Sequence, residues 1–205
     1  MNKQDVAAFF DRLAPGWDEN DLPEGRILEK ILDTARLRAG ERVLDVGCGT
    51  GVLFPHYLRR GVLVTGVDLS GEMARRAAEK YAGDRRVTVL CADAETLPPG
   101  DFDAVMVHNA LPHFPDPAAM IAALSRQLRP LGRLTVAHSA SRAVINQCHR
   151  GAASGVSRGL PAAGELAELF APYFLVDTLI DNKEMYLVSG VLREKELPVD
   201  KSDKS

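Results

Sequence analysis

The segment at residues 43–51, VLDVGCGTG, constrains this chain more than any other stretch of its sequence. A short apolar run, typical of a buried strand, leads directly into three glycines at alternate positions, Gly47, Gly49 and Gly51. Glycine is favoured where the backbone turns sharply or where a ligand packs against the main chain. The segment therefore predicts a strand, a tight loop and a helix, with a ligand held against the loop.

Apolar, β-branched stretches alternate with helix-like stretches along most of the chain. Strands are expected at 42–46, 62–67, 86–91, 103–107 and 133–138, and helices at 24–38, 51–60, 70–82 and 117–128. Ser70 is expected to cap the third helix, and Pro130 and Gly132 to end the fourth. Apolar runs of this length are typical of parallel strands covered on both faces. The alternation therefore favours a doubly wound α/β sheet with right-handed crossovers.

The last third of the chain departs from this alternation. Residues 139–165 are rich in Gly, Ala and Ser, and they predict a helix followed by a loop. A further helix is expected at 164–171, followed by strands at 173–180 and 185–192 with only four residues between them. So short a link predicts an antiparallel hairpin at the edge of the sheet.

Length, charge and cysteine content exclude several classes of protein. The 205 residues correspond to one domain, and the formal net charge of -3 argues against a nucleic-acid coat or a polybasic membrane anchor. The three cysteines are widely spaced, so neither a disulfide framework nor a zinc knuckle is expected. Because the sequence has neither a signal-peptide pattern nor a run of membrane-spanning length, we expect a cytoplasmic protein.

Two acidic residues follow the next strands in positions that suit a nucleoside. Asp68 ends the second strand, 23 positions after Asp45, where a carboxylate can bind a ribose diol across the glycine loop. Asp93 ends the third strand, within reach of an adenine amino group. The dinucleotide pattern G-x-G-x-x-G requires a glycine at position 52, where this chain has Val52, so the spacing disfavours NAD.

Five motifs resemble those of the class I S-adenosylmethionine-dependent methyltransferases. They are VLDVGCGTG at 43–51, GVDLSGEM at 66–73, CADAETLP at 91–98, FDAVMVHNALPHFPDP at 102–117 and LRPLGRLTVAH at 128–138. The motifs follow the family's order and spacing and extend over nearly the whole chain. The resemblance implies a Rossmann-like sheet of seven strands in the order 3-2-1-4-5-7-6, with strand 7 antiparallel.

The resemblance also implies which residues contact S-adenosylmethionine and its product, S-adenosylhomocysteine. The glycine loop would hold the methionyl part, Asp68 the ribose hydroxyls, and Asp93 with Ala94 the adenine, while Leu69 and Met73 would line the adenosine pocket. The expected cofactor-binding residues are Asp45, Gly47, Cys48, Gly49, Thr50, Gly51, Asp68, Leu69, Met73, Asp93, Ala94 and His108.

The opening segment FFDRLAPGWDE resembles the start of methyltransferases that act on small molecules, including those of ubiquinone and menaquinone biosynthesis. In those enzymes a mobile N-terminal helix covers the site. We therefore expect one domain, with residues 1–38 as a helical lid, residues 39–193 as the core and residues 194–205 as a polar tail. Trp17 in the lid is expected to contact the acceptor.

The methyl acceptor is expected at the carboxyl ends of the fourth and fifth strands. Transfer from a sulfonium mainly needs positioning and desolvation, with a base only if the acceptor loses a proton. Nucleic-acid amino-methyltransferases usually carry an (Asn/Asp)-Pro-Pro-aromatic motif after the fourth strand, where this chain reads HNAL. We therefore expect a small-molecule acceptor rather than a nucleic acid.

Several polar side chains near those strand ends are candidates for acceptor chemistry. If residues 140–150 are helical, Arg142, Asn146 and His149 share one face, although a solvated surface helix would show the same pattern. The histidines lack the spacing of a metal site, so no metal is expected. The candidate catalytic residues are His113, His138 and His149, and the candidate acceptor-binding residues are Trp17, Asn109, Arg142 and Asn146.

Two other functions remain open on the sequence alone. One is a noncatalytic regulatory module that binds S-adenosylmethionine, because such a module would keep the same glycine loop. The other, less favoured, is an NAD-dependent oxidoreductase, since the chain has no Tyr-x-x-x-Lys pair as well as the wrong glycine spacing. The identity of the acceptor and the oligomeric state also remain open.

Overall fold

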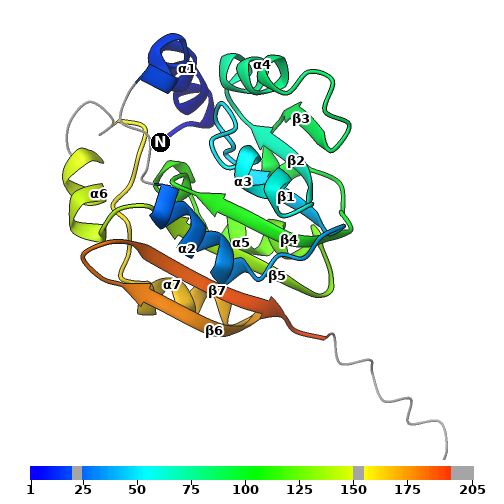
Figure 1. Ribbon diagram of the computed structural model, residues 1–205. Coiled ribbons are helices and arrows are strands. Elements are labelled where there is room, and N and C mark those ends of the chain that lie inside the picture. Colours follow the sequence, from blue (N-terminus) through cyan, green and yellow to red (C-terminus); the bar gives the residue numbers. More distant parts are fainter. Residues whose placement is uncertain (20–24, 150–154, 195–205) are drawn as a thin grey trace, which may run out of the picture.

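A twisted sheet forms the centre of the computed structural model, which describes residues 1–19, 25–149 and 155–194 (Figure 1). The sheet has seven strands in the order β3-β2-β1-β4-β5-β7-β6, which confirms the predicted order. Strands β1 to β5 pair in parallel, and β7 runs antiparallel to both β5 and β6. The strands are β1 (Arg42–Val46), β2 (Leu63–Asp68), β3 (Val87–Cys91), β4 (Phe102–His108), β5 (Leu128–His138), β6 (Phe174–Asp181) and β7 (Tyr186–Leu192).

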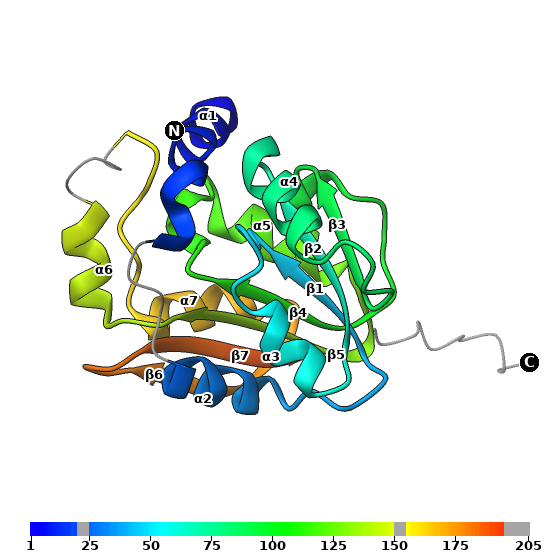
Figure 2. The same ribbon diagram turned by 45° about the horizontal axis from the view of Figure 1, so that its top comes forward.

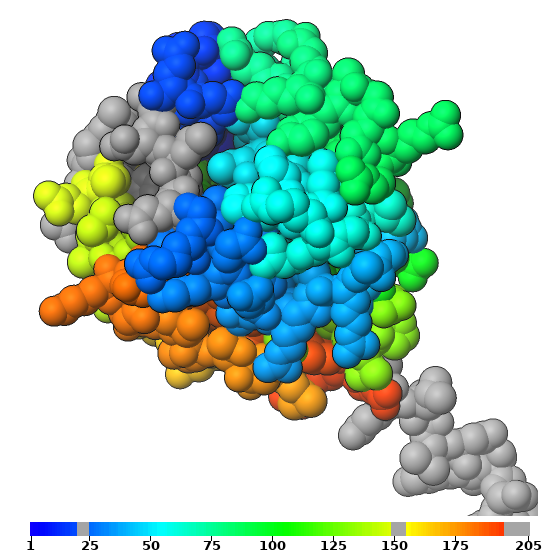
Figure 3. Space-filling view, viewed as in Figure 1, coloured from blue at the N-terminus to red at the C-terminus, as the bar shows by residue number. Residues whose placement is uncertain are grey.

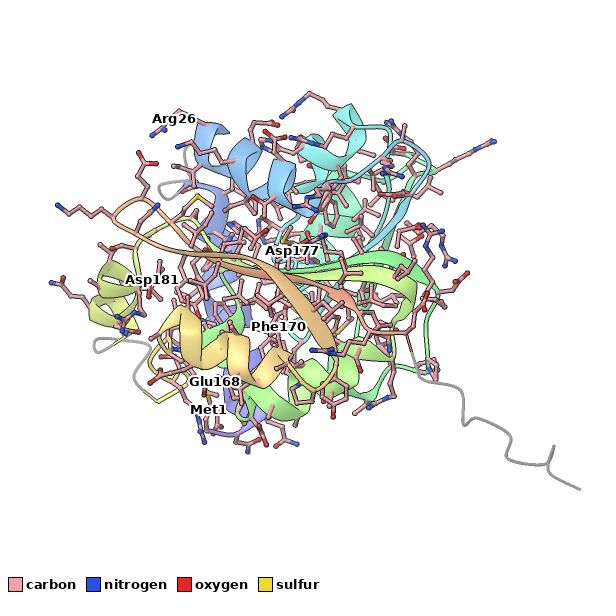
Figure 4. All side chains as sticks on the ribbon, turned by 90° about the horizontal axis from the view of Figure 1, so that it is seen from below. Met1, Arg26, Glu168, Phe170, Asp177 and Asp181 are labelled. Atoms are coloured by element: carbon pink, nitrogen blue, oxygen red, sulfur yellow. The ribbon has the colours of Figure 1, made fainter. Side chains whose placement is uncertain are left out.

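Helices cover both faces of this sheet. One face carries α2 (Gly25–Ala35), α3 (Phe54–Arg59) and α4 (Gly71–Lys80), and the other carries α5 (Pro117–Ser125) and α7 (Ala163–Phe170). Figure 4 shows the sheet nearly edge-on between α2 and α7, with Phe170 between α7 and the strands. The helix α6 (Arg142–His149) lies beyond the end of β5.

Residues of β1 show why the central strands are apolar at successive positions. Val43 packs with Ile31 in the core beneath α2, whereas Leu44 packs with Leu134 in the core beneath α5 and α7. Because side chains of a strand point to opposite faces in turn, a strand covered on both sides needs apolar residues throughout.

Strand β3 differs from this expectation, because it is covered on one face only. It lies at the edge of the sheet, and Leu90 is 39% exposed. The prediction that every parallel strand is covered on both faces is therefore wrong for β3, whose apolar sequence does not reveal that it is an edge strand.

The junction between α5 and β5 also differs from the prediction. The helix ends at Ser125, and Pro130 and Gly132 lie inside β5 rather than at the end of a helix. Leu128 already pairs with Phe102, and the register then shifts before the next pair. The early start of β5 therefore depends on a long-range strand pairing that local turn signals do not report.

The N-terminal segment lies at the end of the sheet where the parallel strands terminate (Figure 2). It comprises α1 (Lys3–Leu13) and the short helix η1 (Ala14–Glu19), and α1 contacts α4 in Figure 3. By contrast, α2 buries Ile27, Leu28 and Ile31 against the sheet face. We therefore restrict the proposed lid to α1 and η1, which are called the cap below.

Within the described residues, no helix combines the length and apolar character needed to cross a lipid bilayer.

Candidate active site

The glycine loop turns sharply between β1 and α3. Gly47, Gly49 and Gly51 have φ values of +67°, +55° and +85°, a region that other residues rarely adopt. A Cβ atom at Gly47 would lie 2.7 Å from the Cβ of Ala110, so this glycine allows the loop to pack closely. Of the described residues, a Cβ atom at Gly49 would have only Trp17 nearby, with the indole nitrogen at 3.8 Å. The backbone at Gly49 therefore borders a space that Trp17 overlies.

Asp68 connects this loop to the start of α4. One carboxylate oxygen accepts from the Gly49 N–H and the other from the Ser70 N–H, each at 2.8 Å. A carboxylate has about four lone-pair positions, so these two bonds leave acceptor capacity for hydroxyl groups. Burial raises the pKa of Asp68 despite these two bonds. Ser70 caps α4 by accepting from the Met73 N–H, as predicted from the sequence.

Asp45 lies below the loop, 2% exposed. Burial, and secondarily the charge of Asp68, raises the pKa of Asp45 well above its ordinary value. Cys48 is also buried, and burial raises the pKa of its thiol. Asp45 in β1 and Cys48 in the loop therefore belong to the buried support of the loop.

Asp93 and Ala94 lie at the end of β3, where the short helix η2 (Ala94–Thr96) begins. One Asp93 oxygen accepts from the Glu95 N–H at 3.0 Å, and the other accepts from Lys3 Nζ at 2.7 Å. Lys3, from the cap, also contacts the carboxylate of Glu95. Of the other predicted adenosine neighbours, Met73 is buried and Leu69 is half-buried.

Two acidic residues of the cap, Asp11 and Asp18, contact the same end of the sheet. Asp11 accepts from Ser70 Oγ at 2.5 Å and from the Glu72 N–H at 3.1 Å. Asp18 accepts from Thr50 Oγ1 at 2.6 Å and forms an ion pair with Lys80 at 2.5 Å. Together with Lys3, these residues place charged groups of the cap on the glycine loop, on the start of α4 and on Asp93. Sequence reasoning missed all three: Asp11 and Asp18 lie within the opening segment FFDRLAPGWDE, from which only Trp17 was selected, and Lys3 precedes that segment.

The end of β4 carries His108 and Asn109. His108 is 6% exposed, its Nε2 atom has no hydrogen-bond partner among the described residues, and burial lowers its pKa to about 4. Asn109 adopts φ +54°. Its side-chain Nδ2 donates to Ser139 Oγ at 2.9 Å, and its Oδ1 accepts from the Ser139 N–H at 3.0 Å. The amide of Asn109 thus joins the loops that follow β4 and β5.

His113 ends η3 (Leu111–His113) and contacts the cap. Its Nδ1 atom lies 2.9 Å from the carbonyl oxygen of Val156. Its ring packs edge-on against Phe10, with centroids 4.7 Å apart, and Phe10 packs in the same way against Trp17 at 5.7 Å. Two predicted acceptor-side residues, His113 and Trp17, are therefore brought together by a ring that the sequence analysis did not select.

The remaining predicted residues lie near α6. His138 is fully buried and packs edge-on against Tyr186. Arg142 donates to Asp181 at 3.0 Å, and the side chain of Asn146 bonds to both the N–H and the carbonyl of Leu160. Their contact with an acceptor stays a prediction. The prediction for the His149 side chain lies outside the described residues. In that described part of the chain, no group of three or more His, Cys, Asp or Glu residues is arranged to hold a metal ion.

Comparison with known proteins shows what this chain is similar to. Residues 44–136 match a family model described as "Methyltransferase domain". The chain is 36% identical over 144 residues to a ubiquinone biosynthesis O-methyltransferase of Thiobacillus denitrificans, covering 64% of this chain and 61% of the relative. It is 36% identical over 148 residues to 27-O-demethylrifamycin SV methyltransferase of Amycolatopsis mediterranei, covering 63% and 54% respectively. The chain thus spans less than two thirds of these relatives.

A solved structure shares the fold at low identity. The N-methyltransferase NodS of Bradyrhizobium japonicum, in complex with S-adenosylhomocysteine, superimposes with a TM-score of 0.73 at 16% identity, over 92% of this chain and 99% of that chain. The sequence motifs, the strand order and the matched residues 44–136 agree. Residues 44–136 are thus similar to the methyltransferase domain family.

Proposed function

We propose that this chain transfers a methyl group from S-adenosylmethionine to a small-molecule acceptor. The observation that carries the proposal is the Asp68 carboxylate, which joins the glycine loop to α4 within the matched family segment and retains acceptor capacity for hydroxyl groups. We also infer that the whole chain acts as one domain and that the cap serves as its lid.

The residues present suit a bound nucleoside. Of the described residues, only Trp17 lies within 4 Å of a Cβ position at Gly49, and the buried Nε2 atom of His108 has no hydrogen-bond partner within the described residues. In this proposal the loop at 47–51 holds the methionyl part, Asp68 the ribose, and Asp93 with Ala94 the adenine. When bound, S-adenosylmethionine supplies a methyl group that its sulfonium has already activated.

The acceptor in this proposal is a small molecule that carries a hydroxyl group. Relatives that share 36% identity are named as O-methyltransferases of ubiquinone biosynthesis and as a methyltransferase of a rifamycin. These names, together with the absence of a nucleic-acid motif after β4, support a small-molecule hydroxyl. The cytoplasmic location stays a prediction.

Calorimetric titration with S-adenosylhomocysteine tests the cofactor assignment. The wild-type chain should bind S-adenosylhomocysteine and should not bind NAD. Asp68→Ala should weaken binding by roughly 1.5–3 kcal/mol, or about 10- to 100-fold, because hydrogen bonds to a charged group are lost.

Asp101→Ala is a matched control, because the side chain of Asp101 is 76% exposed and lies away from the loop. It should leave the affinity unchanged. Unchanged affinity in Asp68→Ala would refute the assignment. Binding of S-adenosylhomocysteine without turnover of any acceptor would instead support the regulatory module.

A further inference from the structure

The two edges of the sheet differ in how they are protected against pairing with another chain. The edge strand β6 carries the exposed residues Asp177 and Asp181, and its register with β7 is irregular. Charges and irregular register are common protections of an edge strand. The edge strand β3, in contrast, has no charged residue from Val87 to Cys91 and pairs with β2 without a register shift. It therefore presents a regular, uncharged edge.

The backbone of β3 carries hydrogen-bonding groups on its outer side. The Arg86 carbonyl accepts from β2 at 2.8 Å, and the Ala92 N–H donates to β2 at 3.0 Å. Because a strand bonds to a given neighbour at every second residue, the even-numbered residues of β3 face β2. The N–H and C=O groups of Val89 and Cys91 therefore point outward. Figure 1 shows β3 as the outermost strand, and no other strand of the described residues pairs with it.

The side chains of β3 leave space for a further strand on both faces of the sheet. Val87 and Val89 pack against the core beneath α3 and α4, whereas Thr88 and Leu90 are exposed on the other face. A surface hollow of about 500 Å³ lies on the α4 side of the same edge, and Arg85, Val87 and Val89 line it with the end of α4. A neighbouring strand could therefore seat side chains on either face.

The charges at the two ends of β3 select the direction of a partner strand. Before β3, Arg86 pairs with Asp84, and Arg85 adds a further positive charge. After β3, the two carboxylates that contact Lys3 leave one negative charge in excess. In an antiparallel pair of β3 strands, the basic end of one strand lies beside the acidic end of the other, whereas a parallel pair would bring like charges together. A second copy of this chain is therefore a partner of matching charge.

We propose that two copies of this chain pair antiparallel through β3, about a two-fold axis at Val89, and form one continuous sheet. In this register the residues with outward backbone groups meet one another. Val89 lies opposite Val89 of the second copy, and Cys91 lies opposite Val87 of the second copy. The two-fold axis makes every contact away from Val89 occur twice.

The same register matches the side chains. On the open face, Thr88 lies opposite Leu90 of the second copy, so that both copies of Leu90 lose exposure. Beyond the strand, Arg85 lies opposite Asp93 of the second copy. Apolar cover in the middle and opposite charges at the ends therefore come from one arrangement, and this inference does not depend on the proposed methyl transfer.

Sedimentation equilibrium of the 205-residue chain tests the association. The wild-type chain should reach twice its mass of 22.2 kDa at about 100 µM and dissociate on dilution. Leu90→Lys should weaken the dimer by about 10-fold or more, because a charge in the middle of an edge strand opposes pairing. Leu63→Lys is the matched control and should leave the dimer unchanged, since Leu63 is 41% exposed against 39% for Leu90 but lies on β2, away from the edge.

Oxidative cross-linking tests the register. All chains carry Cys148→Ser, which removes the exposed cysteine outside β3. Val87→Cys places a thiol opposite Cys91 of the second copy, so mild oxidation should give a disulfide-linked dimer whose peptide map joins position 87 to Cys91. The parent with Val87 should not cross-link, because the two copies of Cys91 lie at opposite ends of the paired strands.

Three results would overturn the inference. One is a wild-type chain that remains monomeric up to about 1 mM, which would leave the edge to a strand of a different protein. Another is equal weakening, or none, in Leu90→Lys and Leu63→Lys, which would place the interface elsewhere. The third is a dimer in which Val87→Cys forms no disulfide with Cys91, which would refute the register. If Leu90→Lys fails to fold, as circular dichroism would show, the cross-linking result decides alone.

Discussion

Apart from the long-range contacts of the cap, the proposed cofactor side and acceptor side of the candidate active site are assembled from contacts of different sequence range. On the cofactor side, Asp68 bonds to Ser70 and Gly49, which are 2 and 19 positions away. On the acceptor side, Asn109 bonds to a residue 30 positions away, and His113 to one 43 positions away. The first set belongs to one strand–loop–helix unit and its neighbour, whereas the second joins separate parts of the chain.

This difference determines how well each side can be predicted from the sequence. A short segment that must turn sharply and bind through its backbone needs particular residues at fixed spacing, and such spacing forms a motif. Contacts between distant segments depend on loops whose lengths vary at little thermodynamic cost. Their residues therefore carry no recognisable spacing.

Overpacking beneath the glycine loop should have the largest effect on stability. In Gly66→Ala, the added Cβ would lie 2.5 Å from Phe54 Cζ and 2.9 Å from Cys48 Sγ. We expect a loss of about 3 kcal/mol, with the melting temperature lowered by roughly 2–4 °C per kcal/mol. Affinity for S-adenosylhomocysteine should also fall, because Cys48 moves with the loop. Thermal melting and calorimetry measure both.

Gly164→Ala in α7 is the control for this substitution. Gly164 lies in α7, and an added Cβ would meet no atom of the described residues within 4 Å. Since alanine favours a helix over glycine by about 0.5–1 kcal/mol, this variant should be slightly stabilised. If Gly66→Ala melts at the wild-type temperature, the loop is less rigidly supported than its contacts indicate.

Breaking the ion pair between β5 and β6 should lower stability without affecting the cofactor side. Arg133, which is 7% exposed, donates to both oxygens of Asp177, at 2.8 and 2.6 Å, and Figure 4 shows Asp177 on the edge strand. Removing one partner of a fully buried pair costs ~3–5 kcal/mol. Asp177 is one-third exposed, so we expect a loss of about 2 kcal/mol in Asp177→Ala.

Chemical denaturation measures this loss, and calorimetry should show unchanged affinity for S-adenosylhomocysteine. Glu184→Ala serves as a matched control, because Glu184 and its partners Lys30 and Arg26 are all about half exposed. Such a surface pair contributes at most about 1 kcal/mol. Equal losses in the two variants would contradict the importance of burial at Arg133.

The same ion pair predicts a pH dependence. The hydrogen bond from Arg133 lowers the pKa of Asp177 from 3.8 to about 2. A carboxylate with a lowered pKa stabilises the fold above its ordinary pKa and loses this contribution on protonation. Stability should therefore fall between about pH 4 and pH 2, with a smaller slope in Asp177→Ala, as denaturant titrations at each pH would show.

The smallest effect is expected at Asn146, which holds the backbone of Leu160 through two hydrogen bonds of 2.6 and 3.2 Å. Asn146→Ala should cost about 1 kcal/mol and increase hydrogen exchange in α6 and near Leu160, with the affinity for S-adenosylhomocysteine unchanged. If Asn146 instead binds the acceptor, KM for the acceptor would rise while hydrogen exchange in α6 stays at the wild-type rate.

Secondary structure was predictable where burial and local signals agree. The bounds of β1 were predicted residue for residue, and the hairpin of β6 and β7 followed from a four-residue link. The start of β5 was not predictable, because the pairing of Leu128 with Phe102 outweighs the helix-ending signals of Pro130 and Gly132. The exposed face of β3 could not be predicted for a similar reason, since the position of a strand in the sheet decides whether it is an edge strand.

By itself, the sequence determined the α/β sheet with its edge hairpin and the glycine loop with Asp68, because backbone conformation and burial restrict which residues each position accepts. The strand order came from the resemblance to a known family. Only the tertiary structure decided that Lys3, Asp11 and Asp18 of the cap contact the cofactor side, and that Val156 orients His113. A charged or polar side chain at the surface is compatible with many partners. Which partner it meets depends on the paths of distant segments, and the apolar pattern that specifies the fold carries no information about that choice.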